Sequence, residues 1–135
     1  MSRRILTGIT TTGIPHIGNY FGAIKPALQL SSEKNVSSYF FLADLHAIIK
    51  QTNPNEIKVS VNEVALAWLS SGLDPEKSFF YRQSNIPEIT ELAWILSCVT
   101  AKGLINRSHA YKAAVQLNHD HTKDEDKGIS MGLFS

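Results

Sequence analysis

Ser38-Tyr39-Phe40-Phe41-Leu42-Ala43 is the stretch of this sequence that decides the fold. It is a continuous run of aromatic and aliphatic residues of strand length, and Asp44 ends it. Continuous rather than alternating hydrophobicity is typical of a strand in a parallel sheet that is covered on both faces. The run therefore predicts a central strand of an α/β protein.

Further elements are predicted on either side of this run. Short β-type runs cover residues 4–7, ending at Gly8, and 78–82. Apolar residues at helical spacing predict helices over 17–28, 54–72 and 87–103, and Pro26 predicts a distortion in the first of them. Strands that alternate with helices indicate parallel crossovers. The predicted fold class is a Rossmann-like open parallel α/β sheet with helices on both faces.

The second helix has the clearest boundaries and the clearest buried face. Asn53 is a good N-cap, Pro54 suits the first turn, and Glu56 can complete a capping box. Gly72 ends the helix. Its predicted buried stripe consists of Ile57, Val61, Val64, Ala65, Trp68 and Leu69. Trp94 and Cys98 of the third helix are also expected to be packed in the interior.

Composition excludes several classes of protein. A chain of 135 residues favours one domain, and a single cysteine excludes a disulfide scaffold. Thirteen basic against twelve acidic residues give a net charge of +1, so bulk charge indicates no nucleic-acid or membrane surface. The longest apolar run, 64–69, is far too short to cross a bilayer, and no apolar stretch of signal-peptide length follows the basic pair Arg3-Arg4. The expected location is cytoplasmic, with no membrane partner.

The loop after the first strand is the candidate site, because ligands of open α/β sheets bind beyond the carboxyl ends of the strands. The glycines match neither a P-loop nor the dinucleotide fingerprint. Pro15-His16-Ile17-Gly18-Asn19 stands at the helix start instead. His16 and Asn19 can donate hydrogen bonds to phosphate oxygens, while Gly18 leaves room for a nucleoside against the backbone. From the residues alone, a helix cap made by His16 and Asn19 is an equally good interpretation.

A family resemblance rests on the stretch GITTTGIPHIGNYFGAI, residues 8–24. It resembles the signature of bacterial tryptophanyl-tRNA synthetases, whose version of the class I H-I-G-H motif ends in Gly-Asn. Segments 42–47, 81–88, 91–96 and 106–113 also resemble that family, in the same order. The resemblance covers essentially the whole chain.

The resemblance implies a tryptophan–tRNA ligase that forms tryptophanyl-adenylate from tryptophan and ATP and then charges tRNA(Trp). It also implies that ATP binds as its Mg²⁺ complex. It also implies a homodimer, with contacts partly from the region of the third helix. Many members have Gln-Pro-Ser where this chain has three threonines, and a second lysine where it has Ala114. The implied catalytic residues are His16, Asn19 and Lys112. The implied ATP-binding residues are Thr10, Thr11, Thr12, Gly18 and Asn19, and the implied tryptophan-binding residues are Gly8 and His46.

Three alternatives stay open. A tyrosyl-type class I synthetase shares the front-end motif but typically has a second histidine where Asn19 stands. A non-catalytic adenine-nucleotide-binding module and an α/β interaction scaffold are the others. His119-Asp120-His121 and nearby His109 have metal-ligand chemistry, but the polar segment 118–127 is expected to be a mobile loop, so no metal site is predicted.

Apolar residues return after that segment, and the chain then ends. We therefore expect residues 1–135 to be the N-terminal portion of a catalytic domain, without the family's C-terminal anticodon-binding domain. The family's indole-reading aspartate and flexible lysine loop would lie further on. The chain alone is accordingly expected to form no adenylate.

Overall fold

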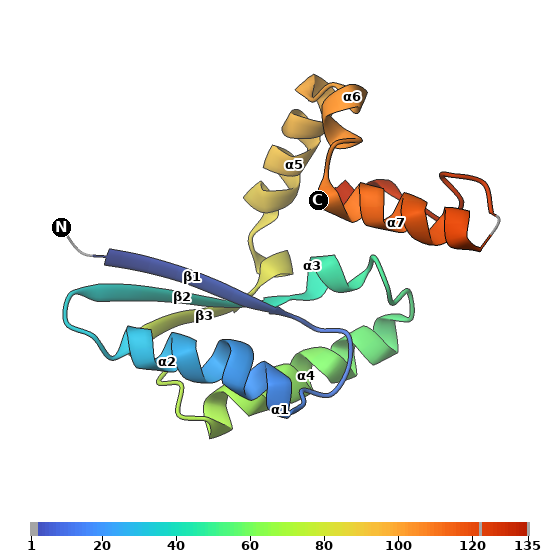
Figure 1. Ribbon diagram of the computed structural model, residues 1–135. Helices are drawn as coiled ribbons and strands as arrows, with labels where there is room; N and C mark the ends of the chain where they lie inside the picture. Colours follow the sequence, from blue (N-terminus) through green and yellow to red (C-terminus); the bar gives the residue numbers. More distant parts are fainter. Residues whose placement is uncertain (1–2, 122, 135) are drawn as a thin grey trace. The chain divides into compact units, whose positions relative to one another are not determined.

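The computed structural model describes residues 3–121 and 123–134. The chain divides into two compact units, Met1–Ile86 and Pro87–Ser135, which are described separately. Figure 1 shows the strands and their connecting helices in the first unit and only helices and loops in the second. None of the helices in the described part of the chain is long and apolar enough to span a membrane.

The first unit is built on three parallel strands, β1 (Arg3–Thr10), β2 (Val36–Ala43) and β3 (Ser78–Arg82), in the order β1-β2-β3. Thr10 pairs with Ala43 and Leu42 pairs with Arg82, so all three strands reach their carboxyl ends at one edge. The predicted open parallel sheet is confirmed. Asp44 ends β2 and residues 78–82 form β3, both as predicted.

The predicted end of the first strand at Gly8 is wrong, because β1 continues to Thr10. Gly8 pairs with Phe41, and a side chain at position 8 would place its Cβ only 2.3 Å from Cζ of the Phe41 ring. Gly8 is therefore a strand residue whose missing side chain makes room for a neighbouring ring, and it does not mark a turn.

Both crossover helices, α2 (Lys25–Ser31) and α4 (Pro54–Ser70), lie on the same side of the sheet (Figure 1). Each strand is followed by its next neighbour in the same direction, and right-handed crossovers then place both helices on one face. Their core is centred on Trp68 of α4, whose ring stacks on Phe40 at 4.9 Å. The buried cluster comprises Ile9, Ile24, Ala27, Phe40, Leu42, Val61, Val64, Trp68 and Leu73.

The other face of the sheet bears aromatic side chains. Tyr39 and Phe79 stack at 4.7 Å, and Phe41 and Tyr81 at 6.0 Å. Leu6 is 66% exposed and Phe79 is 61% exposed. Cross-strand aromatic pairs of this kind stabilise a sheet even where the rings are not covered.

Helix α4 follows its sequence signals closely. The Asn53 side chain accepts a hydrogen bond from the Asn55 N–H at 3.0 Å, and Gly72 ends the helix at a φ of 102°. Glu56 contacts Asn53 through the side-chain amide at 3.1 Å rather than through the backbone as in a capping box. Within the predicted stripe, Leu69 is exposed, so the stripe is not buried over its whole length.

The first predicted helix is divided into α1 (Ile17–Asn19), a π-helix η1 (Tyr20–Ile24) and α2. The N–H of Lys25 bonds to the carbonyl of Tyr20, five residues back. Pro26 has no N–H to continue the regular bonding pattern, which explains a wider turn immediately before it. The predicted distortion is confirmed.

The second unit contains α5 (Pro87–Val99), α6 (Lys102–Ile105), α7 (His109–Asp120) and the short 3₁₀ helix η3 (Met131–Phe134). The predicted stop of the third helix at Gly103 is wrong, because α5 ends at Val99 and Gly103 lies within α6. The expected burial of Trp94 and Cys98 is also wrong: Trp94 is 72% exposed and the Cys98 thiol is free and exposed. Helical spacing predicts an apolar face but does not supply a surface that covers it.

The polar segment 118–127 is only partly a loop. Helix α7 includes His119 and Asp120, and the Asn118 amide donates to the carbonyls of Glu125 and Lys127, each at 2.9 Å. These bonds fold the following turn back onto the helix end.

Replacing Gly8 with alanine tests the close packing of the Phe41 ring against Gly8 in β1. We expect Gly8→Ala to lower the free energy of unfolding by about 1–3 kcal/mol, because the added methyl group overlaps the Phe41 ring. Urea unfolding followed by Trp68 fluorescence in a Trp94→Phe background measures the change. Gly22→Ala is the matched control, since its Cβ meets nothing within 4 Å. A Gly8→Ala chain as stable as its parent would contradict this packing.

Candidate functional site

A cavity of about 190 Å³ lies beside the loop that follows β1, within the first unit. Thr10, Thr12, His16 and Asn19, four of the predicted ATP-binding or catalytic residues, line it together. Its remaining walls are Ile9, Gly13, Ile14, Pro15 and Val64. Strand β1 supplies one side and the start of α1 supplies the other. The structure therefore brings the core of the predicted nucleotide site into one place.

Thr11 is placed differently from its two neighbours. Its side chain is fully buried, it does not line the cavity, and its hydroxyl has no hydrogen-bond partner among the described residues. Thr10 and Thr12 face the cavity while Thr11 faces the interior.

His16 and Asn19 form a reciprocal cap on α1. The His16 Nδ1 accepts a hydrogen bond from the Gly18 N–H at 3.1 Å, and the Asn19 Oδ1 accepts one from the His16 N–H at 2.9 Å. The capping interpretation of these residues is thus realised in the structure. Each of the two side chains has a second polar atom, so each can form a further hydrogen bond besides those of the cap.

The polar atoms of His16 and Asn19 that take no part in the cap are hydrogen-bond donors. A neutral imidazole that accepts at Nδ1 carries its proton at Nε2, and an amide that accepts at Oδ1 keeps two N–H groups at Nδ2. His16 is exposed, Asn19 is half-buried, and both line the cavity. The cap therefore leaves both residues with N–H groups available to an anion at the helix start.

Gly18 supports this arrangement sterically. A Cβ at position 18 would lie 2.9 Å from Cε1 and 3.0 Å from Nδ1 of the His16 ring. A side chain there would require the imidazole to shift. Gly18 thus leaves room for the observed orientation of His16, whether or not a nucleoside lies against it.

His46 lies in the short helix α3 (Asp44–Ala47), directly after β2 at the same edge of the sheet. Its ring contacts the side chain of Gln83, from the 3₁₀ helix η2 (Gln83–Asn85) that follows β3. Asp44 also bonds to η2, because its carboxylate accepts from the Ser84 N–H at 3.0 Å and from the Ser84 hydroxyl at 2.5 Å. Asp44 thus orders this turn, as its place after the strand indicates.

Gln83 is the residue of this region that sequence reasoning missed. It is buried, polar and adjacent to a predicted site residue. A signal was present, because polar side chains that directly follow neighbouring parallel strands meet at one edge. That argument needs the strand order, which the sequence does not state.

The other predicted tryptophan-binding residue, Gly8, lies under the Phe41 ring. The ring fills the space directly above the glycine backbone. An indole group could approach Gly8 only if Phe41 turned aside.

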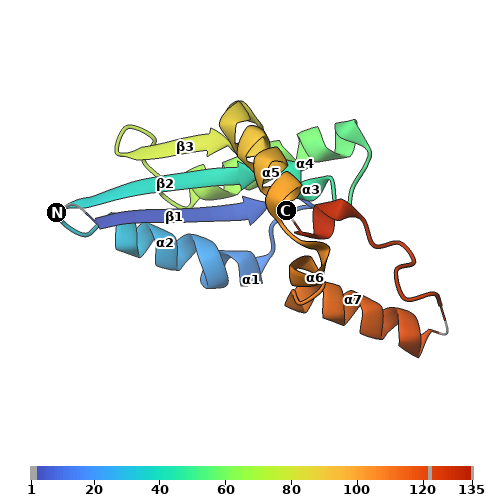
Figure 2. The same ribbon diagram turned by 90° about the horizontal axis from the view of Figure 1, so that it is seen from above.

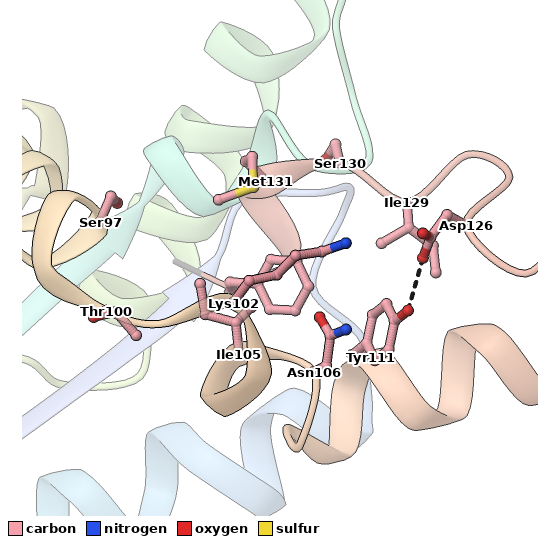
Figure 3. Close-up of a pocket in the computed structure, with 11 residues that line it drawn as sticks. Ser97, Thr100, Lys102, Ile105, Asn106, Tyr111, Asp126, Ile129, Ser130 and Met131 are labelled. Atoms are coloured by element: carbon pink, nitrogen blue, oxygen red, sulfur yellow. Dashed lines mark hydrogen bonds between the residues drawn. The ribbon is translucent and has the colours of Figure 1, made fainter.

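Lys112 lies on α7 in the second unit, where its side chain is exposed. That unit has a cavity of its own, about 420 Å³ in volume, whose lining includes Lys102, Asn106, Tyr111 and Asp126 but not Lys112. Figure 3 shows the hydrogen bond from the Tyr111 hydroxyl to the Asp126 carboxylate, 2.8 Å long, at one end of this cavity. That bond, with some burial and the nearby negative charges, raises the pKa of Tyr111 above its ordinary value.

The described residues contain no group of three or more His, Cys, Asp or Glu side chains placed to hold a metal ion. In particular, no acidic residue is among those that line the cavity beside α1.

The family model for class I tRNA synthetases of the tryptophan and tyrosine type matches residues 2–135. The chain belongs to that family. It is 59% identical over 135 residues to a tryptophan–tRNA ligase of Pseudomonas putida, and 58% identical over 134 residues to one of Neisseria meningitidis. These alignments cover 100% and 98% of this chain, but only 30% and 40% of the two relatives. The chain thus spans about a third of the length of these relatives.

Solved structures of the family have the same fold. A tryptophanyl-tRNA synthetase from Campylobacter jejuni matches 99% of this chain and 39% of its own, with a TM-score of 0.80 and 37% identity. A second structure of the Campylobacter jejuni protein, in complex with ADP and tryptophan, matches with a TM-score of 0.78 and 38% identity. An archaeal tyrosyl-tRNA synthetase, at 18% identity and a TM-score of 0.70, shares the fold.

The Tyr111–Asp126 bond can be tested by titration. We expect Asp126→Asn to lower the pKa of Tyr111 toward its ordinary value of about 10, because the amide carries no negative charge. The ¹³Cζ chemical shift of Tyr111, followed with pH, measures the change. Asp124→Asn is the matched control and should leave that pKa in place.

The direction of the Tyr111 pKa shift also determines how the stability of the fold depends on pH. The pKa of Tyr111 is higher in the folded chain than in the unfolded chain. The bond therefore stabilises the fold fully below the ordinary tyrosine pKa of about 10, and this stabilisation is lost as the pH rises through the folded pKa. A pKa of Tyr111 that is the same in parent and Asp126→Asn chains would contradict the bond.

Proposed function

We propose that this chain is part of a tryptophan–tRNA ligase, which activates tryptophan with ATP and transfers it to tRNA(Trp). The observation that carries the proposal is the cavity beside α1, which His16 and Asn19 both line and where each keeps N–H groups that the cap does not use. Support also comes from the tryptophan–tRNA ligases to which the chain is 58–59% identical. The Campylobacter jejuni relative in complex with ADP and tryptophan supports an adenine nucleotide and tryptophan as the ligands.

Catalysis in this scheme is positioning and charge stabilisation. The tryptophan carboxylate attacks the α-phosphorus of ATP, the bond to the bridging oxygen breaks, and pyrophosphate leaves with its electron pair. His16 Nε2 and Asn19 Nδ2 donate to phosphate oxygens whose negative charge grows in the transition state. The hydroxyls of Thr10 and Thr12 flank the nucleotide, and Thr11 supports the loop from inside. Gly18 lets the adenosine lie against the helix start.

Mg²⁺ fits this site as part of the ATP complex. The cavity lining beside α1 offers hydroxyl, imidazole and amide groups but no carboxylate. Mg²⁺ commonly binds through substrate phosphates and retains several waters. The ion would neutralise charge on the phosphates while the side chains of this chain hold those phosphates in place.

The amino-acid end of the site is proposed to lie between Gly8 and His46, at the same edge of the sheet. Tryptophan binding would require the Phe41 ring to leave the space above Gly8. Lys112 is proposed to approach the pyrophosphate end of ATP, on the strength of the resemblance of segment 106–113. Its neighbour Ala114 supplies no second cation.

The assembly and location follow from the same function. We propose a homodimer, which the exposed apolar side chains of α5 support, including Leu92, Trp94, Leu96 and Val99. The chain would contribute the N-terminal portion of the catalytic domain, and the anticodon-binding domain would lie outside it. The proposed location is the cytoplasm, where charged tRNA is used.

ATP binding by the chain is the first test. We expect His16→Ala and Asn19→Ala each to weaken ATP binding about 10- to 100-fold, since each removes a hydrogen bond to a charged group worth about 1.5–3 kcal/mol. Isothermal titration calorimetry measures the affinity. His119→Ala and Asn62→Ala, both at exposed helical positions, are the matched controls.

A further variant separates the cap from the ligand contact. Asn19→Asp keeps an oxygen that accepts from the His16 N–H, but it loses the Nδ2 donor and adds a negative charge. We expect it to weaken ATP binding at least as much as Asn19→Ala while the fold stays intact by circular dichroism. Unchanged affinity in the Asp variant would show that these residues only cap the helix.

Amino-acid specificity can be tested in a chimera. The corresponding segment of the Pseudomonas putida ligase is replaced by this chain, and exchange of labelled pyrophosphate into ATP is measured. We expect exchange that depends on tryptophan and not on tyrosine, and at least a 100-fold lower rate when His16 and Asn19 are both alanine. Exchange that depends on tyrosine, or a folded but inactive chimera beside an active parent, would overturn the proposal.

A further inference from the structure

Gln83 is a buried polar residue placed against the imidazole of His46. Only 6% of its surface is exposed. Both ends of its amide lie close to one ring nitrogen, with Nε2 3.0 Å and Oε1 3.1 Å from His46 Nδ1. Two hydrogen-bonding patterns fit these two distances, one for each neutral tautomer of the ring.

A third contact distinguishes the patterns. The backbone N–H of His46 donates to Gln83 Oε1 at 3.4 Å. If Nε2 of Gln83 donates to Nδ1, both ends of the buried amide have a partner. If Nδ1–H instead donates to Oε1, the amide oxygen accepts twice and Nε2 has no acceptor. An unpaired buried donor is unfavourable, so the first pattern is favoured.

The segment that bears Gln83 is itself held in place. Ser84 bonds to both oxygens of the Asp44 carboxylate, and Asp44 Oδ1 also accepts from the Leu45 N–H at 3.1 Å. These bonds join η2 to the first turn of α3, the helix that carries His46. The Gln83–His46 contact is therefore built by two short elements that are fixed to each other.

We propose that Gln83 is a positioning residue that holds His46 in the Nε2–H tautomer. Nδ1 is then occupied by Gln83, and the free N–H at Nε2 is available to an acceptor atom such as a carboxylate oxygen. This role rests on the proposed function, in which His46 borders the amino-acid pocket. Gln83 acts through His46, which its amide contacts.

The tautomer can be read directly by NMR of the whole 135-residue chain with ¹⁵N-labelled histidine. Long-range ¹H–¹⁵N spectra at about pH 8, above the ordinary pKa of histidine, report the protonation of each ring nitrogen. The chain has five histidines, and His46→Phe assigns the resonances of position 46. We expect His46 Nδ1 to show the downfield shift of an unprotonated nitrogen and Nε2 the shift of a protonated one.

Gln83→Glu should reverse the tautomer. A carboxylate only accepts hydrogen bonds, so it draws the imidazole proton to Nδ1. Gln29→Glu, an exposed position on α2 of the same unit, is the matched control and should leave the His46 pattern unchanged. Backbone amide spectra check that both variants fold.

Three results would overturn the proposal: a parent chain with Nδ1–H at His46, averaged shifts from two exchanging tautomers, or a folded Gln83→Glu chain with Nδ1 still unprotonated. The parent spectrum decides the first two even if the variant fails to fold. No substrate is present, so failure of this proposal is distinct from failure of ATP or tryptophan binding.

Discussion

The parallel register of the three strands is the constraint on which the candidate site depends. Thr10 pairs with Ala43, and Leu42 pairs with Arg82, so β1, β2 and β3 end side by side. Figure 2 shows the three strand arrows pointing the same way toward one edge. The loop with His16, the helix with His46 and the turn with Gln83 all begin there. The stacked Phe40 and Trp68 rings pack the sheet against α4.

At this edge, polar side chains serve the fold with one atom and leave another free. His16 uses Nδ1 to cap α1, and Asn19 uses Oδ1 to accept from His16. In the tautomer that we propose for it, His46 has the same division, because Nδ1 faces Gln83. In each case the bonded atom determines which atom remains, and what remains is an N–H donor. A helix cap and an anion site are therefore compatible, because the atoms that form the cap determine which N–H groups remain for an anion.

Local signals in the sequence were sufficient for much of this fold. The central strand, the Asn53 cap, the Gly72 stop and the distortion near Pro26 each depend on residues close in the chain, and the structure contains all four. Gly8 was misread because its meaning depends on Phe41, which is distant in sequence. The Thr10, Thr12, His16 and Asn19 cluster was predictable since its members lie within ten residues of one another in the chain. Gln83 was not, because its contact with His46 arises only after β3 pairs beside β2.

The helices show the same limit of local information in another form. Apolar residues recur at helical spacing in both α4 and α5, and both patterns predict a buried face. In α4 that face meets Phe40 and Leu42, and Trp68 is fully buried. In α5 the corresponding side chains, Leu92, Leu96 and Val99, are exposed. Periodicity thus predicts that a helix has an apolar face. Whether that face is buried depends on the tertiary contacts of the helix.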